Sequence, residues 1–238
     1  MVSLPRDYAE GSRRYPVVYL LDADYSFAIA RNVVEHLADR GRLPWAILVG
    51  IGYDGPPRYR EHRTRDYTPT HVPTGGYGPE WQRHSGGGPA FRRFLAEELF
   101  PFVERTYRAT DERALVGHSY GALFGAWTAL TDPALIDHYV MVSPSLWYDD
   151  RLLFRVEETA ARSGEPLPAT IHLAVGALEG NRERDMVGDL RELGRRLEAR
   201  ASPGTRLEVE VLDGETHDSV FPRALSNGLR AIARGSNP

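Results

Sequence analysis

The stretch from Arg113 to Gly125, "RALVGHSYGALFG", places a serine between two glycines directly after a short apolar run. In the pattern Gly-x-Ser-x-Gly, a strand turns sharply into a helix, and the serine hydroxyl projects from the turn. The glycines at 117 and 121 permit the close backbone approach that such a turn requires. We therefore expect Ser119 to be a nucleophile on a strand-to-helix elbow rather than a serine on an ordinary bend.

Strand and helix patterns alternate along the rest of the chain. Apolar, β-branched runs predict buried strands at 17–21 and 45–53, and apolar residues at helical spacing predict a helix over 27–41 between them. Further strands should begin the segments 138–148, 169–180 and 206–217, and further helices should cover 91–107 (kinked at Pro101), 122–132, 186–200 and 220–233. This order predicts one α/β domain over 1–238, with a mostly parallel sheet flanked by helices.

Residues 54–89 differ from the rest, because they are crowded with Gly, Pro, Arg, His and aromatic residues and show no sustained period. A loop of this length inside a compact domain is usually either functional or disordered. The arginines and aromatic side chains favour function. We expect a long active-site loop that contacts the substrate.

Composition excludes several classes of protein. No run approaches the roughly 18 apolar residues of a membrane span, and the N-terminus lacks the pattern of a signal peptide, so we expect a cytoplasmic protein. A net charge of −4 with mixed signs argues against nucleic-acid binding. The absence of cysteine and lysine excludes thiolate chemistry, a Walker-type phosphate loop and a lysine Schiff base. No metal-binding or dinucleotide motif is found, so we expect no metal and no cofactor.

A serine nucleophile needs a base, and three histidines follow Ser119. His172 lies inside a predicted strand, and His138 precedes another at the end opposite the catalytic edge. His217 lies in the loop "DGETHDSVF" at the carboxyl end of a strand, where ligands gather in open α/β sheets. We therefore expect His217 to be the base.

The acid should lie between the nucleophile and the base, again beyond a strand. Glu179 comes three residues after Gly176 at the end of a predicted strand, and Asp185 is the alternative. A carboxylate at this place would orient the imidazole of His217 and stabilise its protonated form.

The oxyanion that forms on attack needs preorganised hydrogen-bond donors. One should be the backbone N–H of Tyr120, directly after the nucleophile. The other should come from the loop after "VVYLLD", where Ala23 lies at the turn and Asp24 offers its N–H.

A family resemblance runs along nearly the whole chain from Leu4 onward. The segments "YPVVYLLDADYSF", "RTRDYTP", "FRRFLAEELFPFVERTY", "LVGHSYGALFG", "SPSLWYDD", "VGALEG" and "DGETHDSVF" occur in the order seen in the Putative esterase family of α/β-hydrolases. The chain most resembles the siderophore trilactone esterase branch, which includes enterobactin and salmochelin hydrolases. The resemblance implies a serine esterase that works through an acyl-enzyme on a small-molecule ester, with a Ser-His site whose acid is weak or absent in some members.

The resemblance also implies substrate-binding residues. Arg63 of "RTRDYTP" would bind an anionic or catechol-bearing substrate, with Arg65 as the alternative unless it pairs with Asp66. Trp147 of "SPSLWYDD" looks like the family's aromatic pocket wall, although a core tryptophan fits the pattern equally well. Tyr25 is also expected to contact substrate.

The chain departs from the family pattern in two places. Ala23 replaces the glycine usual after "LLD", which affects the oxyanion loop, and family members have further strands before the segment "VSLPRDYAEG". A sheet short at this edge would invite pairing with another subunit, so a homo-oligomer is expected. The competing functions are a general carboxylesterase, such as a feruloyl or acetyl esterase or an S-formylglutathione hydrolase, and a non-catalytic protein that binds a siderophore or ester.

Overall fold

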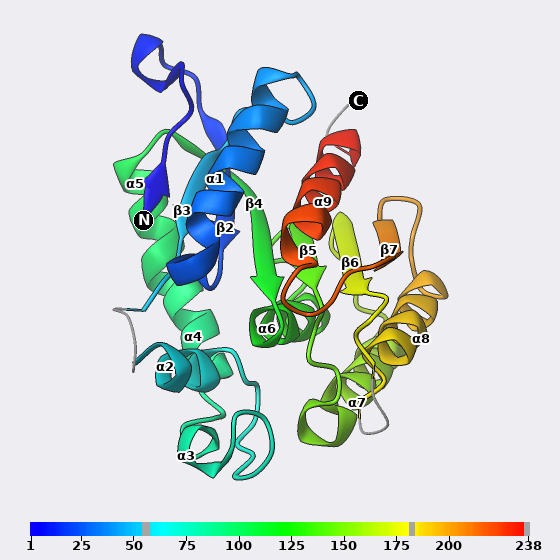
Figure 1. The fold of residues 1–238 in the computed structure, drawn as a ribbon. Helices are drawn as coiled ribbons and strands as arrows, with labels where there is room; N and C mark the ends of the chain where they lie inside the picture. Colours follow the sequence, from blue (N-terminus) through cyan, green and yellow to red (C-terminus); the bar gives the residue numbers. More distant parts are fainter. Residues whose placement is uncertain (54–57, 181–183, 236–238) are drawn as a thin grey trace. The chain divides into compact units, whose positions relative to one another are not determined.

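The computed structural model describes residues 1–53, 58–180 and 184–235 (Figure 1). Over these residues, seven strands form one sheet in the order β1-β3-β2-β4-β5-β6-β7. The strands are β1 (Val2–Ser3), β2 (Tyr15–Leu20), β3 (Ile47–Gly50), β4 (Ala109–His118), β5 (His138–Val142), β6 (Thr170–Gly176) and β7 (Arg206–Leu212). The helices are α1 (Ala23–Asp39), α2 (Arg58–Asp66), α3 (Pro79–Gln82), α4 (Gly88–Phe94), α5 (Phe100–Thr106), α6 (Tyr120–Thr131), α7 (Tyr148–Ser163), α8 (Met186–Glu198) and α9 (Phe221–Gly235). Along the described residues, no helix combines the length and the apolar character needed to span a membrane.

Backbone contacts divide the chain into two compact units, Met1–Leu115 and Val116–Pro238. The expectation of a single domain over 1–238 stays a prediction. In the first unit, β2 and β3 are parallel and α1 connects them, which confirms the predicted strand–helix–strand unit. The two-residue strand β1 runs antiparallel to β3, where Val2 lies opposite Val49. Two residues carry no period, so the sequence pattern could not indicate this strand.

The segment expected to be a loop at 54–89 contains helices α2 and α3 and the start of α4. Residues 54–57 of that segment lie outside the described residues. The α2 sequence "RYREHRTRD" is mostly charged, so it shows no apolar period from which a helix could be predicted. Its packing comes from arginine and tyrosine side chains instead.

The helix predicted over 91–107 is continuous from Gly88 to Thr106 but changes geometry in the middle. Residues Leu95–Leu99 form a π-helical turn, and the N–H of Phe100 bonds to the carbonyl of Leu95, five residues back. Pro101 has no N–H to donate to the preceding turn. The distortion expected at Pro101 is therefore accommodated one turn earlier, as a widened turn within the helix.

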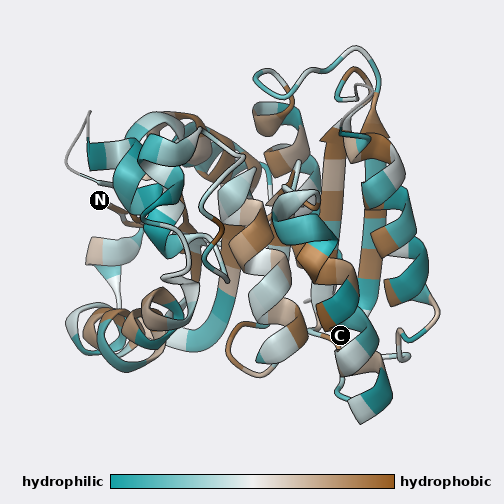
Figure 2. Ribbon diagram, turned by 90° about the horizontal axis from the view of Figure 1, so that it is seen from below, coloured by the Kyte–Doolittle hydropathy of each residue, from teal (hydrophilic) through white to brown (hydrophobic). Residues whose placement is uncertain are grey.

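In the second unit, β5, β6 and β7 are parallel, with His138 opposite Thr170 and Thr170 opposite Arg206. Helix α9 covers one face: a Cβ on its Gly228 would lie 2.5 Å from a methyl carbon of Val140 on β5. Helix α8 packs against Val209 on β7 through Gly194. Figure 1 shows α9 crossing in front of β5 and β6, and Figure 2 shows hydrophobic strands beside helices whose surfaces alternate in hydropathy. These features confirm an α/β fold with helices flanking a mostly parallel sheet.

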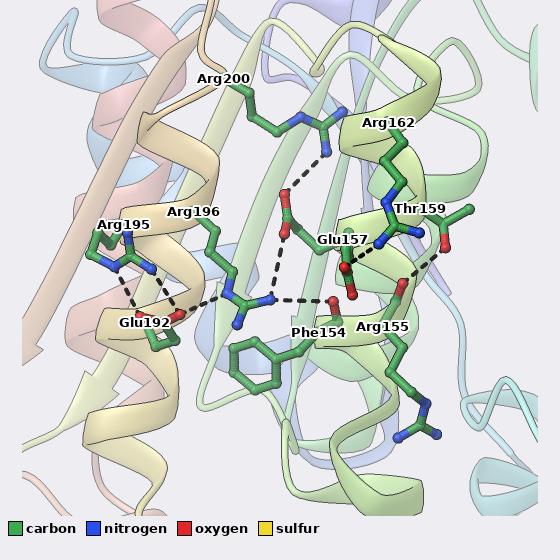
Figure 3. Close-up of polar contacts among 10 residues, drawn as sticks. Phe154, Arg155, Glu157, Thr159, Arg162, Glu192, Arg195, Arg196 and Arg200 are labelled. Carbon is green, nitrogen blue, oxygen red and sulfur yellow. Dashed lines mark hydrogen bonds and ion pairs between the residues drawn. The ribbon is translucent and has the colours of Figure 1, made fainter.

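An ion network ties α7 to α8 in this unit (Figure 3). Glu157 of α7 is buried, and its carboxylate lies 3.8 Å from Arg196 on α8 and 3.5 Å from Arg200, just beyond the end of α8. Arg196 also donates to Glu192, one turn earlier on α8, at 2.7 Å. A buried carboxylate needs such partners, because an unpaired charge would be costly to remove from water.

We expect Glu157→Gln to destabilise the protein by about 1 kcal/mol, since it removes the charge that both arginines share. Urea unfolding measures the change. The same substitution at the next residue, Glu158, is the matched control, because Glu158 pairs with Arg162 on the exposed face of α7. Glu158→Gln should leave the unfolding midpoint unchanged. Equal midpoints for the two variants would contradict a tie between α7 and α8.

Candidate active site

Ser119 lies between the last residue of β4 and the first residue of α6, and its backbone is in an unusual conformation. Its φ is 57° and its ψ is −114°, a region that non-glycine residues rarely occupy. The backbone is held there by two hydrogen bonds: the Ser119 N–H donates to the Val142 carbonyl, and the Leu123 N–H donates to the Ser119 carbonyl, each at 2.9 Å. Strain of this kind persists when the surrounding structure over-determines it, and it is typical of a nucleophile elbow.

Gly117 explains why the elbow needs a glycine on its strand side. A Cβ at this position would lie 2.5 Å from the backbone carbonyl group of Gly121. No side chain fits there unless the strand and the helix separate. The glycine spacing seen in the sequence therefore corresponds to a real backbone contact at the turn.

The structure brings Glu179 and His217 together. His217 Nδ1 lies 2.6 Å from Glu179 Oε2, and the other carboxylate oxygen accepts hydrogen bonds from the Ser143 hydroxyl (2.6 Å) and the Gly176 N–H (2.7 Å). The Glu179 side chain is 1% exposed, whereas that of His217 is 38% exposed. A buried carboxylate with three donors can hold one ring nitrogen of a more accessible imidazole, so that the other nitrogen is available for chemistry.

Asp185, the alternative acid, has a different role in the structure. It is the N-cap of α8, and its side chain accepts a hydrogen bond from the Gly188 N–H at 2.8 Å. This interaction is a common way to satisfy the first turn of a helix. Of the two carboxylates, only Glu179 is hydrogen-bonded to His217.

The loops that carry Glu179 and His217 are joined through their backbones. The Leu178 N–H donates to the Glu215 carbonyl at 3.0 Å, and the Ala177 N–H donates to the Leu212 carbonyl at 2.9 Å. Gly176 lies at the closest approach, where a Cβ would come within 2.3 Å of the Glu215 carbonyl oxygen. The acid loop and the base loop are thus in direct contact before any side chain is considered.

Burial of Glu179 by itself would raise its pKa, but hydrogen bonds from His217, Ser143 and Gly176 outweigh burial and lower the pKa below its ordinary value. A carboxylate with a lowered native pKa binds fewer protons in the folded state than in the unfolded state. Its contribution to stability is present above the unfolded pKa, about 4.5, and is lost as pH falls through the lower native value.

We therefore expect Glu179→Gln to flatten the fall in stability between about pH 5 and pH 3. Urea unfolding at a series of pH values measures this slope. The same substitution at the exposed Glu10 is the control and should leave the slope as it is in the wild type. A wild-type slope in Glu179→Gln would mean that the carboxylate is not stabilised by its three donors.

His118 packs beside the base. Its ring centroid lies 4.6 Å from that of His217 and 6.0 Å from that of Phe221. His118 therefore forms part of the wall against which the imidazole of His217 rests.

Sequence reasoning did not single out two serines near these residues. Ser143 donates to Glu179, as described above, and the Ser145 hydroxyl oxygen lies 3.3 Å from the hydroxyl oxygen of Ser119. Both serines are buried. The available signal was a pair of hydroxyl residues directly after the apolar run of β5, at the carboxyl end of a central strand.

Trp147 is half-buried and lies beside the residue that follows the nucleophile. Its ring centroid is 6.0 Å from that of Tyr120, and the Arg184 guanidinium carbon lies 3.9 Å from the centroid of the Trp147 ring. A guanidinium stacked on an indole is a favourable cation–π arrangement. Arg184 was not identified from the sequence, because a single arginine in the charged segment "NRERD" carries no distinguishing pattern.

The remaining predicted site residues, Asp24, Tyr25 and Arg63, lie in the unit Met1–Leu115. Arg63 is 1% exposed, and its guanidinium donates to both carboxylate oxygens of Asp22, at 2.9 Å and 2.8 Å. The fork that the sequence prediction assigned to substrate is thus occupied by Asp22. Arg65 forms a 2.6 Å ion pair with Asp66, the other possibility recognised from the sequence.

Asp22 forms the turn that precedes α1. Its φ is 55°, its N–H donates to the Tyr67 hydroxyl at 3.2 Å, and its carboxylate accepts from Tyr59 as well as from Arg63. The next residue, Ala23, uses its N–H to donate to the Ile51 carbonyl at 3.0 Å. The N–H of Ala23 is therefore already engaged.

Asp24 and Tyr25 follow in the first turn of α1. The Asp24 carboxylate accepts the Tyr53 N–H at 2.9 Å, and over the described residues the Asp24 N–H has no hydrogen-bond acceptor. Tyr25 is half exposed, with its ring edge-on to Tyr59 at 6.2 Å. Asp24 thus offers a backbone donor, and Tyr25 offers an exposed aromatic ring.

One cluster of metal-ligating residue types occurs elsewhere in the described part of the second unit. His172, Glu208 and Glu210 bring ligand atoms within 4.8 Å of one another. However, Glu208 pairs with Arg234 at 3.4 Å, and Glu210 accepts from Asn227 at 2.8 Å. Burial lowers the pKa of His172, which favours its neutral form. We therefore assign this cluster to the packing of β6 and β7 against α9.

A mostly parallel sheet, a serine on a strained strand-to-helix elbow and a hydrogen-bonded histidine–glutamate pair beyond later strands define an α/β-hydrolase. Comparison with known proteins gives the particular group. The chain belongs to the family described as Putative esterase, whose model matches residues 1–232.

Several similar proteins are named as siderophore esterases. The chain is 34% identical to ferri-bacillibactin esterase BesA of Bacillus subtilis over 235 residues, which cover 94% of this chain and 81% of that protein. It is 29% identical to the siderophore enterobactin esterase of Emericella nidulans, with 91% and 81% covered. The solved structure of siderophore hydrolase EstA from Aspergillus nidulans matches with a TM-score of 0.87 at 27% identity, covering 99% of this chain and 89% of that one. The chain is accordingly a serine esterase, an enzyme that hydrolyses carboxylic esters.

Proposed function

We propose that this esterase hydrolyses the ester bonds of a siderophore of the catecholate trilactone type, with Ser119, His217 and Glu179 as its catalytic triad. The observation that carries the triad is the 2.6 Å contact between Glu179 and His217, in the same unit as the strained elbow of Ser119. Relatives named for ferri-bacillibactin and enterobactin support the substrate class.

In the proposed reaction, Glu179 holds the Nδ1 proton of His217, so that Nε2 is the base. His217 takes the hydroxyl proton of Ser119 as Oγ forms a bond to the ester carbonyl carbon. The backbone N–H of Tyr120 donates to the resulting oxyanion, and the N–H of Asp24, in the first unit, stays the predicted second donor. Protonated His217 then gives its proton to the leaving alcohol, which leaves the acyl group on Ser119. A water activated by His217 next attacks the acyl-enzyme, and Ser119 regains its proton as the carboxylic acid departs.

The residues around Trp147 suit an aromatic, oxygen-rich acyl group. Its indole lies beside Tyr120, and Arg184 adds a positive charge stacked on the ring. A planar catecholate could stack on such a surface while its oxygens meet the guanidinium. Tyr25 stays a predicted substrate contact, and Arg63 would act by holding the Asp22 turn.

A turnover panel tests this function against its alternatives. We expect kcat/KM for a trilactone siderophore to exceed that for a feruloyl ester and for p-nitrophenyl acetate by at least about tenfold. Equal values across the panel would indicate a general carboxylesterase. Tight binding of the siderophore without turnover of any ester would indicate a binding protein. A cytoplasmic location and a homo-oligomeric state stay predictions.

A further inference from the structure

The short turn Ser143-Pro144-Ser145 follows β5 directly and lies between Ser119 and Glu179 of the proposed triad. Its two serines are among the most buried polar residues of the chain, at 0% and 1% exposure. A buried hydroxyl needs a hydrogen-bond partner, so the partners that each serine finds indicate what it does.

Ser143 faces the acid. Its hydroxyl donates to Glu179 Oε1 at 2.6 Å, and its N–H donates to the Ala174 carbonyl on β6 at 2.7 Å. Its φ is 48°, in the left-handed region. A glycine would adopt this conformation more easily, so a serine here pays in backbone strain for a hydroxyl that reaches the carboxylate.

Ser145 faces the nucleophile. Its N–H donates to the Ser119 carbonyl at 3.3 Å, and its hydroxyl oxygen lies 3.3 Å from the hydroxyl oxygen of Ser119. A single residue, Pro144, separates Ser145 from Ser143, and the proline ring fixes its own φ and stiffens the turn. The distance between the two hydroxyl groups is therefore set by a rigid piece of backbone.

We propose that Ser143-Pro144-Ser145 is the positioning element of the catalytic site, a proposal that rests on the function proposed above. Ser143 keeps the Glu179 carboxylate ionised and directed at His217. Ser145 donates its hydroxyl hydrogen to Ser119 Oγ, which leaves the hydrogen of Ser119 for His217. This hydrogen bond strengthens as the proton of Ser119 leaves and charge develops on Oγ, so it favours the transition state over the resting state.

The Ser145 arm is tested by Ser145→Ala and Ser145→Thr with p-nitrophenyl acetate. We expect kcat to fall about tenfold in Ser145→Ala while KM stays within about twofold, and kcat to recover in Ser145→Thr, which keeps the hydroxyl. Ser202→Ala, the same change at an exposed serine, should behave as wild type. A rate in Ser145→Ala equal to or above that of wild type would overturn this arm, because Ser145 would then be a bystander or would compete with His217 for the proton.

The Ser143 arm uses Ser143→Ala and Ser143→Gly, and glycine also relieves the left-handed φ. Both variants lose the donor to Glu179, so the native pKa of Glu179 should rise toward its ordinary value. The fall in stability between about pH 5 and pH 3 should therefore be flatter than in wild type, because the native and unfolded pKa values of Glu179 come closer together, and kcat should drop about tenfold. Wild-type kcat and a wild-type pH profile in Ser143→Gly would overturn this arm.

Ser119→Ala, measured in the same assay, separates the two proposals. If Ser119→Ala keeps its turnover, the triad itself is wrong. If Ser119→Ala is inactive and the Ser143 and Ser145 variants keep wild-type rates, the triad stands and only the positioning role fails. Thermal unfolding of each variant identifies any loss of rate that comes from loss of fold.

Discussion

Ester hydrolysis by Ser119→Ala should fall at least about 10³-fold, to the residual rate that the oxyanion donors and substrate binding support without a nucleophile, while the unfolding midpoint stays near that of wild type. The rate falls because no other described hydroxyl occupies the elbow, and an activated nucleophile cannot be replaced by binding alone. The fold persists because alanine takes the place of serine at the same φ of 57° without changing the backbone contacts to Val142 and Leu123. Release of p-nitrophenolate measures the rate, and circular dichroism measures the fold.

His217→Ala should lose activity to a similar extent, and the double variant should be no slower than either single variant. Residues that act as one unit are not additive, because removing one member already disables the other. Wild-type enzyme should show a burst of p-nitrophenolate that neither variant shows, since the burst reports the acyl-enzyme. Independent, additive losses in the double variant would argue that Ser119 and His217 do not serve the same step.

Arg63→Ala should destabilise the first unit by about 3–5 kcal/mol, because it leaves the Asp22 carboxylate buried without its counter-charge. Arg63 and Asp22 are each 1% exposed, so water cannot replace the lost partner without opening the structure. Urea unfolding measures the loss. Arg65→Ala is the matched control two residues away, because Arg65 pairs with Asp66 while its own side chain is half exposed. We expect its midpoint to stay close to that of wild type.

A double variant separates charge from packing at this pair. In Arg63→Met/Asp22→Asn no charge is left unpaired, so much of the stability lost in Arg63→Ala should return. If the double variant is as unstable as Arg63→Ala, then contacts of the arginine with the surrounding tyrosines, rather than its charge, hold the Asp22 turn.

Most strands and helices could be predicted from the sequence, because apolar periods report burial directly. Helix α2 (Arg58–Asp66) could not, because its residues are held by charge and aromatic contacts that leave no apolar period. Pro101 predicted a distortion of this helix, but not its position. The π-helical turn lies at Leu95–Leu99, and its place depends on how the whole helix packs.

The candidate site divides in the same way. The elbow at Ser119 and the strand-end loops of Glu179 and His217 follow from chain order, and the structure adds the hydrogen bond between the last two. Ser143 could not be identified from the sequence. Its hydroxyl reaches Glu179 only because its backbone is in the left-handed region, and a serine at a given position does not predict that conformation. The pairing of Arg63 with Asp22 could not be predicted, since only the fold brings the Asp22 carboxylate within reach of the guanidinium, and contact of Arg63 with substrate stays a prediction.

The backbone contacts between the Gly176–Glu179 loop and the Leu212–His217 loop have a consequence for engineering. Because Leu178 and Ala177 bond to the other loop, and because Gly176 leaves room for nothing but hydrogen, neither loop can be redesigned alone. In a library that varies only one loop, most variants would place the imidazole of His217 out of line with Glu179. Exchange with a homologous enzyme should succeed only when both loops are transplanted together, as a single cassette.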